Sequence, residues 1–88
     1  MANSNQAKKR LRQNEKQRIR NKSLRSEIKT LTKNVLSSVE EKDLESADEF
    51  FRKVVSKLDK AVKRHVYHRN TAARWKSRVA SAVNAAKS

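Results

Sequence analysis

The chain contains neither glycine nor proline in 88 residues, and this absence constrains its fold more than any other feature. Tight turns between strands draw on glycine for positive φ and on proline for a fixed φ. Helix interiors disfavour both residues. The sequence therefore predicts an all-α protein whose helix ends are marked by capping residues and by charge.

Residues 5–39 are predicted to form one long helix with two different halves. In the second half, apolar residues recur at steps of three and four, at Leu24, Ile28, Leu31, Val35 and Val39. This spacing places them on one face of an α-helix, where burial against other helices stabilises it. The first half has no such stripe and is crowded with lysine and arginine. Because nothing supports that half, we expect it to fray when the protein is alone.

The second predicted helix runs to about residue 64 and has two possible starts. Asp43 is a good N-cap, while Ser46 followed by Glu49 has the spacing of a capping box. The sequence leaves both starts open.

A third helix is predicted over residues 71–86, with Asn70 as its N-cap. All three helices are amphipathic and the two connections are short. This pattern predicts a single antiparallel three-helix bundle over residues 1–88, with the basic half of the long helix overhanging the other two.

Charge is concentrated at the two ends of the chain. The net charge is +14 and the isoelectric point is near 10.9. Residues 1–34 carry a net +9, residues 35–60 carry −2 and residues 61–88 carry +7. Only Glu15 and Glu27 oppose the 11 cations of the first segment. Such unrelieved like charge predicts a polyanionic partner that binds both ends of the chain.

The cations of the long helix gather into a strip as the helix enters the apolar half. We call Arg18, Lys22, Arg25, Lys29 and Lys33 the cationic strip. Its residues follow one another at steps of three and four, roughly 120° from the apolar face. The apolar face is therefore expected to pack against the other helices, and the neighbouring face to bind the polyanionic partner.

The residue types exclude several chemistries. The absence of cysteine excludes disulfides, thiolate metal sites and thiol nucleophiles. No nucleophile, base and orienting partner are suggested together, so we expect no enzyme, no catalytic residue and no cofactor. We also expect no metal site, although two sets of residues are competing interpretations. These are a magnesium site at Glu40, Glu41, Asp43 and Glu45, and the pair His65 and His68.

The beginning of the chain lacks the apolar run of a secretory signal, and no 18 apolar residues follow one another. We therefore expect a cytoplasmic protein. An arginine-rich organellar transit peptide is the competing interpretation of the first residues, disfavoured because no separate segment precedes the helical stripe.

Several runs of residues together resemble the bacterial small-subunit ribosomal protein twenty family. The most specific run covers residues 68–79, with the sequence His-Arg-Asn-Thr-Ala-Ala-Arg-Trp-Lys-Ser-Arg-Val. At the other end the matching runs are Met1-Ala2-Asn3, Ala7-Lys8-Lys9-Arg10, Arg20-Asn21 and Lys29-Thr30. The resemblance covers the whole chain. It implies a three-helix bundle that binds small-subunit ribosomal RNA directly, early in assembly, by wedging its long helix between RNA helices.

The chain departs from that family at three positions. The family usually has glycine where this chain has His65, and often where it has Lys42. Trp75 stands at a position that is usually polar in the family. Either Trp75 packs at the edge of the bundle or it stacks on a base, and the same alternatives apply to Tyr67.

We therefore expect a non-enzymatic, ribosome-bound structural protein whose partner is small-subunit ribosomal RNA. Phosphate contacts are predicted along the long helix at Lys8, Lys9, Arg10, Arg12, Arg18, Arg20, Lys22, Arg25 and Lys29. Hydrogen bonds to sugar or phosphate are predicted at Asn14, Asn21, Ser23 and Ser26. The third helix is predicted to contribute His68, Arg69, Asn70, Arg74, Lys76, Ser77 and Arg78, with a further phosphate site at the backbone amides of residues 70–73.

Few aromatic residues and no known base-reading motif favour recognition of RNA shape and phosphate geometry. We expect few or no protein contacts in the ribosome, no membrane and no small-molecule substrate. A histone-like DNA-compacting protein is the main alternative, because it shares the charge and the helical pattern. A membrane-surface helix is a third possibility, which suffers because residues 8–20 lack a broad apolar face.

Overall fold

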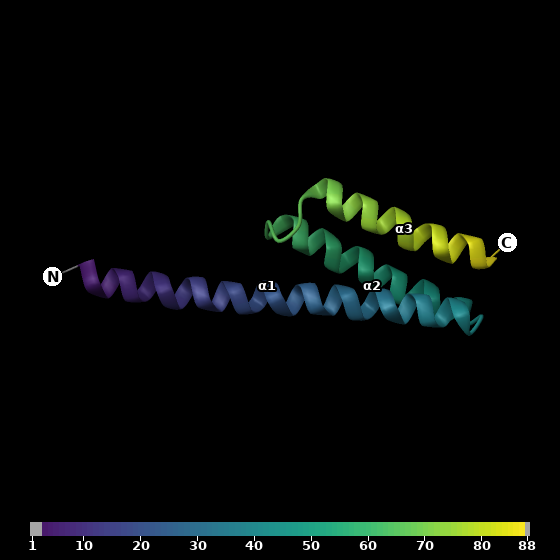
Figure 1. Cartoon of the computed structure of the whole chain (residues 1–88), viewed down its shortest axis with the longest axis horizontal. Helices are drawn as coiled ribbons and strands as arrows, with labels where there is room; N and C mark the ends of the chain where they lie inside the picture. The colour runs from purple at the N-terminus through teal and green to yellow at the C-terminus, as the bar shows by residue number, and fades with distance from the viewer. Residues whose placement is uncertain (1–2, 88) are drawn as a thin grey trace.

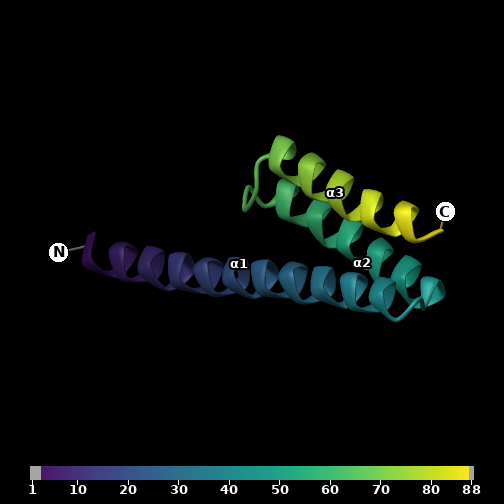
Figure 2. The same cartoon turned by 45° about the vertical axis from the view of Figure 1, so that its right-hand side comes forward.

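The computed structural model describes residues 3–87 and consists there of three α-helices (Figure 1). They are α1 (Asn3–Glu40), α2 (Leu44–Lys63) and α3 (Arg69–Lys87). Figures 1 and 2 show α2 running back along the second half of α1, and α3 reversing again beside α2. The predicted all-α bundle is thus confirmed. Met1, Ala2 and Ser88 lie outside the described residues, as do the side chains of Asn3 and Ser4.

The core is built from the predicted apolar faces. Leu24, Ile28 and Val35 of α1 are buried against Val54 and Leu58 of α2 and against α3. The contributions of the other helices to this cluster are Ala47, Ala61, Ala72, Val79 and Val83. Full burial of a side chain such as Leu58 contributes about 1.5–3 kcal/mol. Small residues on α3 let it approach the other two helices closely.

The first half of α1 extends beyond the bundle, which gives the molecule a long axis of 66 Å against 22 and 13 Å for the others. Every residue from 5 to 20 is exposed, and Leu24 is the first buried residue of the helix. We call residues 3–20 the overhang. The overhang predicted from the sequence is confirmed. It is helical from Asn3, while its expected fraying in the free protein stays a prediction.

Both connections end a helix with the same hydrogen-bonded turn. At the end of α1 the Asp43 N–H donates to the Ser38 carbonyl (2.8 Å) and the Lys42 N–H to the Val39 carbonyl (3.1 Å). At the end of α2 the Val66 N–H donates to the Ala61 carbonyl (2.8 Å) and the His65 N–H to the Val62 carbonyl (3.1 Å). These paired bonds define Schellman motifs.

The Schellman motif requires a left-handed residue, and this chain has no glycine to supply it. Lys42 has φ of 63° and His65 has φ of 59°. A side chain in this region costs roughly 1–2 kcal/mol because its Cβ crowds the following carbonyl. The resemblance implied glycine at the positions of Lys42 and His65, and these are the two residues with left-handed φ among residues 3–87.

The structure decides between the two starts of α2 and corrects the start of α3. Asp43 is the N-cap of α2, since its carboxylate accepts the Ser46 N–H at 3.2 Å. The prediction that α3 begins at residue 71 with Asn70 as its cap was wrong. The helix begins at Arg69, because His68 caps it: the His68 carbonyl accepts from Ala72 N–H and its Nδ1 from Asn70 N–H.

The helices of residues 3–87 include none that is long and apolar enough to cross a membrane.

Replacing either left-handed residue by glycine should stabilise the protein. We expect Lys42→Gly and His65→Gly each to raise the free energy of unfolding by roughly 0.5–1 kcal/mol, because the strain at Cβ is removed. Urea denaturation followed by circular dichroism measures this. Lys53→Gly, in the interior of α2, is the control and should destabilise by about 1 kcal/mol. Destabilisation at all three positions would contradict the strain argument.

The Asp43 cap should make the stability of the protein depend on pH in the acidic range. Hydrogen bonds from the Ser46 side chain, and then from its backbone N–H, lower the pKa of Asp43 from 3.8. The carboxylate therefore stabilises α2 above pH 3.8, and this contribution is lost as pH falls through the lowered pKa. Thermal melts between pH 2 and 6 should show a steeper acid loss for the wild type than for Asp43→Asn, which keeps an acceptor oxygen. Parallel profiles would refute the role of this cap.

Candidate nucleic-acid interface

The residues of α1 predicted to bind are displayed on its surface. Asn21 is half-buried and the others are exposed, namely Lys8, Lys9, Arg10, Arg12, Asn14, Arg18, Arg20, Lys22, Ser23, Arg25, Ser26 and Lys29. The predicted binding residues of the overhang point in several directions around the helix axis, because successive residues are rotated by roughly 100° and these do not share one face. Those beyond residue 21 are restricted to the sides that α2 and α3 leave free.

The packing of α3 on α1 brings Arg74 and Arg78 of α3 beside the second half of α1. Thr32 of α1 contacts α3 through a hydrogen bond with Trp75. Viewed down the axis of α1, the cationic strip lies within roughly 100° of Thr32 on one side. The buried residues Leu24, Ile28 and Val35 lie on the other side of Thr32. Arg74 and Arg78 of α3 border the same groove as Thr32. The strip and these two arginines therefore lie on the same side of the bundle, and we call them together the basic surface.

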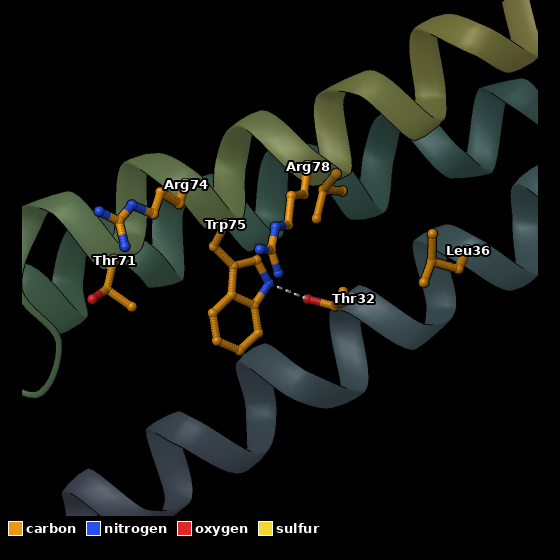
Figure 3. Close-up of a pocket in the computed structure, with 7 residues that line it drawn as sticks. Thr32, Leu36, Thr71, Arg74, Trp75 and Arg78 are labelled. Carbon is orange, nitrogen blue, oxygen red and sulfur yellow. Dashed lines mark hydrogen bonds between the residues drawn. The ribbon is translucent and has the colours of Figure 1, made fainter.

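A groove between α1 and α3 runs through this basic surface. Thr32 and Leu36 of α1 line it together with Thr71, Arg74, Trp75, Arg78 and Val79 of α3. Figure 3 shows the Trp75 indole reaching from α3 toward α1, with Arg74 and Arg78 on either side of it. The groove combines an apolar floor with guanidinium groups, and its lining residues include no carboxylate.

Trp75 packs at the edge of the bundle, which settles one of the alternatives left open by the sequence. Its Nε1–H donates to Thr32 Oγ1 at 2.9 Å, and the Thr32 hydroxyl donates to the Ile28 carbonyl at 2.8 Å. The Tyr67 ring lies 5.6 Å from the indole at 41°. Both aromatic residues are partly buried against the core. Trp75 and Tyr67 thus join the head of α3 to the bundle.

The head of α3 offers fewer free donors than the sequence predicted. The His68 Nδ1 accepts the Asn70 N–H at 3.1 Å, and the His68 carbonyl accepts the Ala72 N–H at 3.1 Å. The expected phosphate site at the amides of residues 70–73 is therefore wrong for Asn70 and Ala72. Arg69 and the Asn70 side chain are exposed here.

Ion pairs occupy two of the predicted contact residues. Lys76 of α3 pairs with Asp59 of α2, on a different side of α3 from the groove, and Ser77 is exposed. Arg18 pairs with Glu15 at 2.6 Å, with both side chains more than half exposed. Such exposed pairs contribute little. The remaining pairs tie helices together, Lys57 to Glu27 and Lys87 to Asp48.

A second basic site was missed by the sequence analysis. Where α1 leaves the bundle, it forms a cleft with the end of α2, which we call the junction cleft. Its lining includes Lys16, Arg20, Asn21, Lys63, Arg64 and His65. The Lys-Arg-His run at residues 63–65 is a local basic signal, but its approach to Arg20 depends on how α1 and α2 cross.

The magnesium site considered from the sequence at Glu40, Glu41, Asp43 and Glu45 is not assembled in the described residues. Within residues 3–87, no three or more histidine, cysteine, aspartate or glutamate side chains gather as metal ligands.

Comparison with known proteins matches the family model described as ribosomal protein S20 to residues 2–84. The chain belongs to the ribosomal protein S20 family. It is 49% identical over 85 residues to the small ribosomal subunit protein bS20 of Acidithiobacillus ferrooxidans, covering 97% of this chain and 93% of that protein. The bS20 of Nitrosomonas eutropha is 47% identical over 85 residues, covering 97% and 98%. The bS20 of Coxiella burnetii is 46% identical over 83 residues, covering 94% and 92%.

These matches confirm the resemblance to the S20 family that the basic N-terminal runs and the motif at residues 68–79 indicated. The structure adds where those motifs lie in space. The motif forms the head of α3 and borders the groove. Ala7-Lys8-Lys9-Arg10 lies on the overhang, and Lys29-Thr30 lies on the half of α1 that packs in the bundle.

The hydrogen bond between Trp75 and Thr32 should couple the two residues energetically. In a double-mutant cycle of Trp75→Phe, Thr32→Val and the double variant, we expect a coupling free energy of about 1 kcal/mol in urea denaturation. The isosteric replacement of threonine by valine controls for packing. Strictly additive losses would show that the bond contributes nothing to joining α3 and α1.

Proposed function

We propose that this protein is a structural component of the small ribosomal subunit that binds small-subunit ribosomal RNA directly. It neutralises phosphates where RNA helices converge and packs those helices together during assembly. One observation carries the proposal beyond family membership: α3 packs on α1 with Arg74 and Arg78 bordering the groove at Thr32, on the side of the bundle that carries the cationic strip. The names of its bS20 relatives support the ribosomal assignment.

Phosphate is the ligand that this surface suits best. Arginine forks two hydrogen bonds onto one phosphate, and lysine adds a point charge. The overhang presents cations around its whole circumference with no protein packed against residues 5–20. Such a rod gains stability where anionic surface approaches from several sides, because each contact releases counterions from the RNA.

The exposed apolar residues support RNA, with few protein contacts, as the principal partner. Leu11, Ile19 and Leu36 are the large apolar side chains exposed within the described part of the chain, and all lie on α1. Leu11 and Ile19 stand singly among the cations of the overhang. A protein interface would call for a contiguous apolar centre with charge at its rim, and these positions do not provide one.

A competition titration at fixed salt tests the proposal against the DNA-compacting alternative. Labelled small-subunit ribosomal RNA is bound to the protein and displaced by unlabelled ribosomal RNA, by random-sequence duplex DNA or by an unrelated structured RNA. We expect the two unrelated competitors to act only at a large excess. Equal displacement by all three would mean that the charge binds polyanions generically, and would favour the DNA-compacting function.

The overhang should bind RNA without holding the bundle together. We expect Arg10→Ala, Arg12→Ala and Arg18→Ala combined to weaken RNA binding roughly tenfold or more. The slope of log affinity against log salt should fall by about 2, since three phosphate contacts are lost. The melting temperature should stay nearly unchanged, because the three side chains are exposed and the Arg18 pair with Glu15 contributes little.

The matched control removes three cations from the exposed surface of α2, by Arg52→Ala, Lys53→Ala and Lys60→Ala together. It should weaken RNA binding much less at the same change in net charge. Equal losses of binding in the two triple variants, or equal losses of binding and melting in the overhang variant, would contradict this division of roles.

A further inference from the structure

We infer that the junction cleft is a second phosphate-binding site, in which α1 and the end of α2 together hold one phosphodiester group of RNA. The inference rests on the proposed function, and it assigns a role to Lys16, Lys63, Arg64 and His65, which lie outside the strip and the groove. Figures 1 and 2 show the setting: α1 and α2 diverge here, and the connection that follows α2 faces the middle of α1.

Positive charge enters the cleft from both of its walls. Lys16 and Arg20 line it from α1, and Lys63 and Arg64 line it from the end of α2. The described residues that line the cleft include no carboxylate. The ion pairs formed within residues 3–87 involve none of these four cations. Their mutual repulsion is therefore relieved by an anion seated between the walls.

The end of α2 does not cancel this charge. A helix C-terminus carries partial negative charge on its last carbonyl groups. Here the carbonyls of Lys60, Ala61 and Val62 accept the N–H groups of Arg64, Val66 and His65. With these oxygens occupied by the Schellman turn, the side chains of Lys63 and Arg64 dominate the field at the mouth of the cleft.

The left-handed residue of the turn adds a hydrogen-bond donor to the cleft. His65 has φ of 59° and is among the residues that line the cleft. Glycine would form the same turn at lower cost in strain but would bring no imidazole. Asn21, also in the lining, supplies an amide. Two polar groups beside four cations provide donors for the non-bridging oxygens of a phosphodiester.

The cleft lies on a different side of α1 from the cationic strip. Gln17 and Arg20, which line it, continue the buried side of α1 beyond the bundle, whereas the strip lies roughly 120° around the helix. A phosphate held here therefore belongs to a different stretch of RNA backbone from those bound by the strip. The site would fix the direction of the overhang relative to the bundle.

The test compares two charge-matched pairs of substitutions in the full chain. Lys63→Gln with Arg64→Gln empties one wall of the cleft, and Arg52→Gln with Lys53→Gln removes the same charge elsewhere on α2. With labelled small-subunit ribosomal RNA, we expect the cleft pair to lower affinity roughly tenfold and the salt slope by about 1. The control pair should change both much less. Circular dichroism melts check that both variants remain folded.

A second comparison separates the side chain of His65 from the turn that it occupies. His65→Gly should lower RNA affinity roughly fivefold, by loss of one hydrogen bond, although it raises the melting temperature. Lys42→Gly changes the equivalent position at the other connection, and should raise the melting temperature without comparable loss of binding. Unchanged affinity in His65→Gly would remove His65 from the site.

Failure of the inference and failure of the proposed function give different results. If wild-type protein retains its preference for ribosomal RNA but the two charge-matched pairs bind alike, the junction cleft is not a phosphate site. If unrelated duplex DNA displaces ribosomal RNA as readily as unlabelled ribosomal RNA does, the proposed function itself is overturned, and the assignment of RNA to the cleft falls with it.

Discussion

The burial of Leu24, Ile28 and Val35 against α2 and α3 is the interaction on which the rest of the structure depends. It holds the second half of α1 helical and fixes the rotation of this helix within the bundle. Because a helix is a stiff rod, fixing one half also determines where the other half points. The overhang therefore presents its cations at positions set by contacts that begin only at Leu24.

Most of the cations of α1 lie on a different part of the chain from the residues that form the core. Like charges destabilise a compact state by repelling one another. A net charge of +14 on 88 residues therefore opposes the stabilisation that one small core provides. Much of this charge lies on the overhang, where the side chains are exposed and far from the core. The central segment carries acidic residues that pair with cations of α3, Asp48 with Lys87 and Asp59 with Lys76.

The absence of glycine places strain at both connections. Lys42 and His65 adopt the left-handed conformation because the Schellman turns require it. These two connections illustrate the limit of reasoning from capping residues. The N-cap Asp43 was among the predicted alternatives, yet the start of α3 was missed, because histidine is not a preferred N-cap and its Nδ1 accepts only once the turn has placed it near the Asn70 N–H.

The sequence by itself determined that the protein is helical and that Leu24, Ile28 and Val35 face a core. It also predicted that both ends of the chain bind a polyanion. Periodicity and charge are local properties, so they can be read without coordinates. Only the tertiary structure decided that Arg74 and Arg78 border the groove with Thr32, and that Lys63 and Arg64 face Arg20. These proximities depend on how the helices rotate and cross, which is set by the packing of many side chains at once.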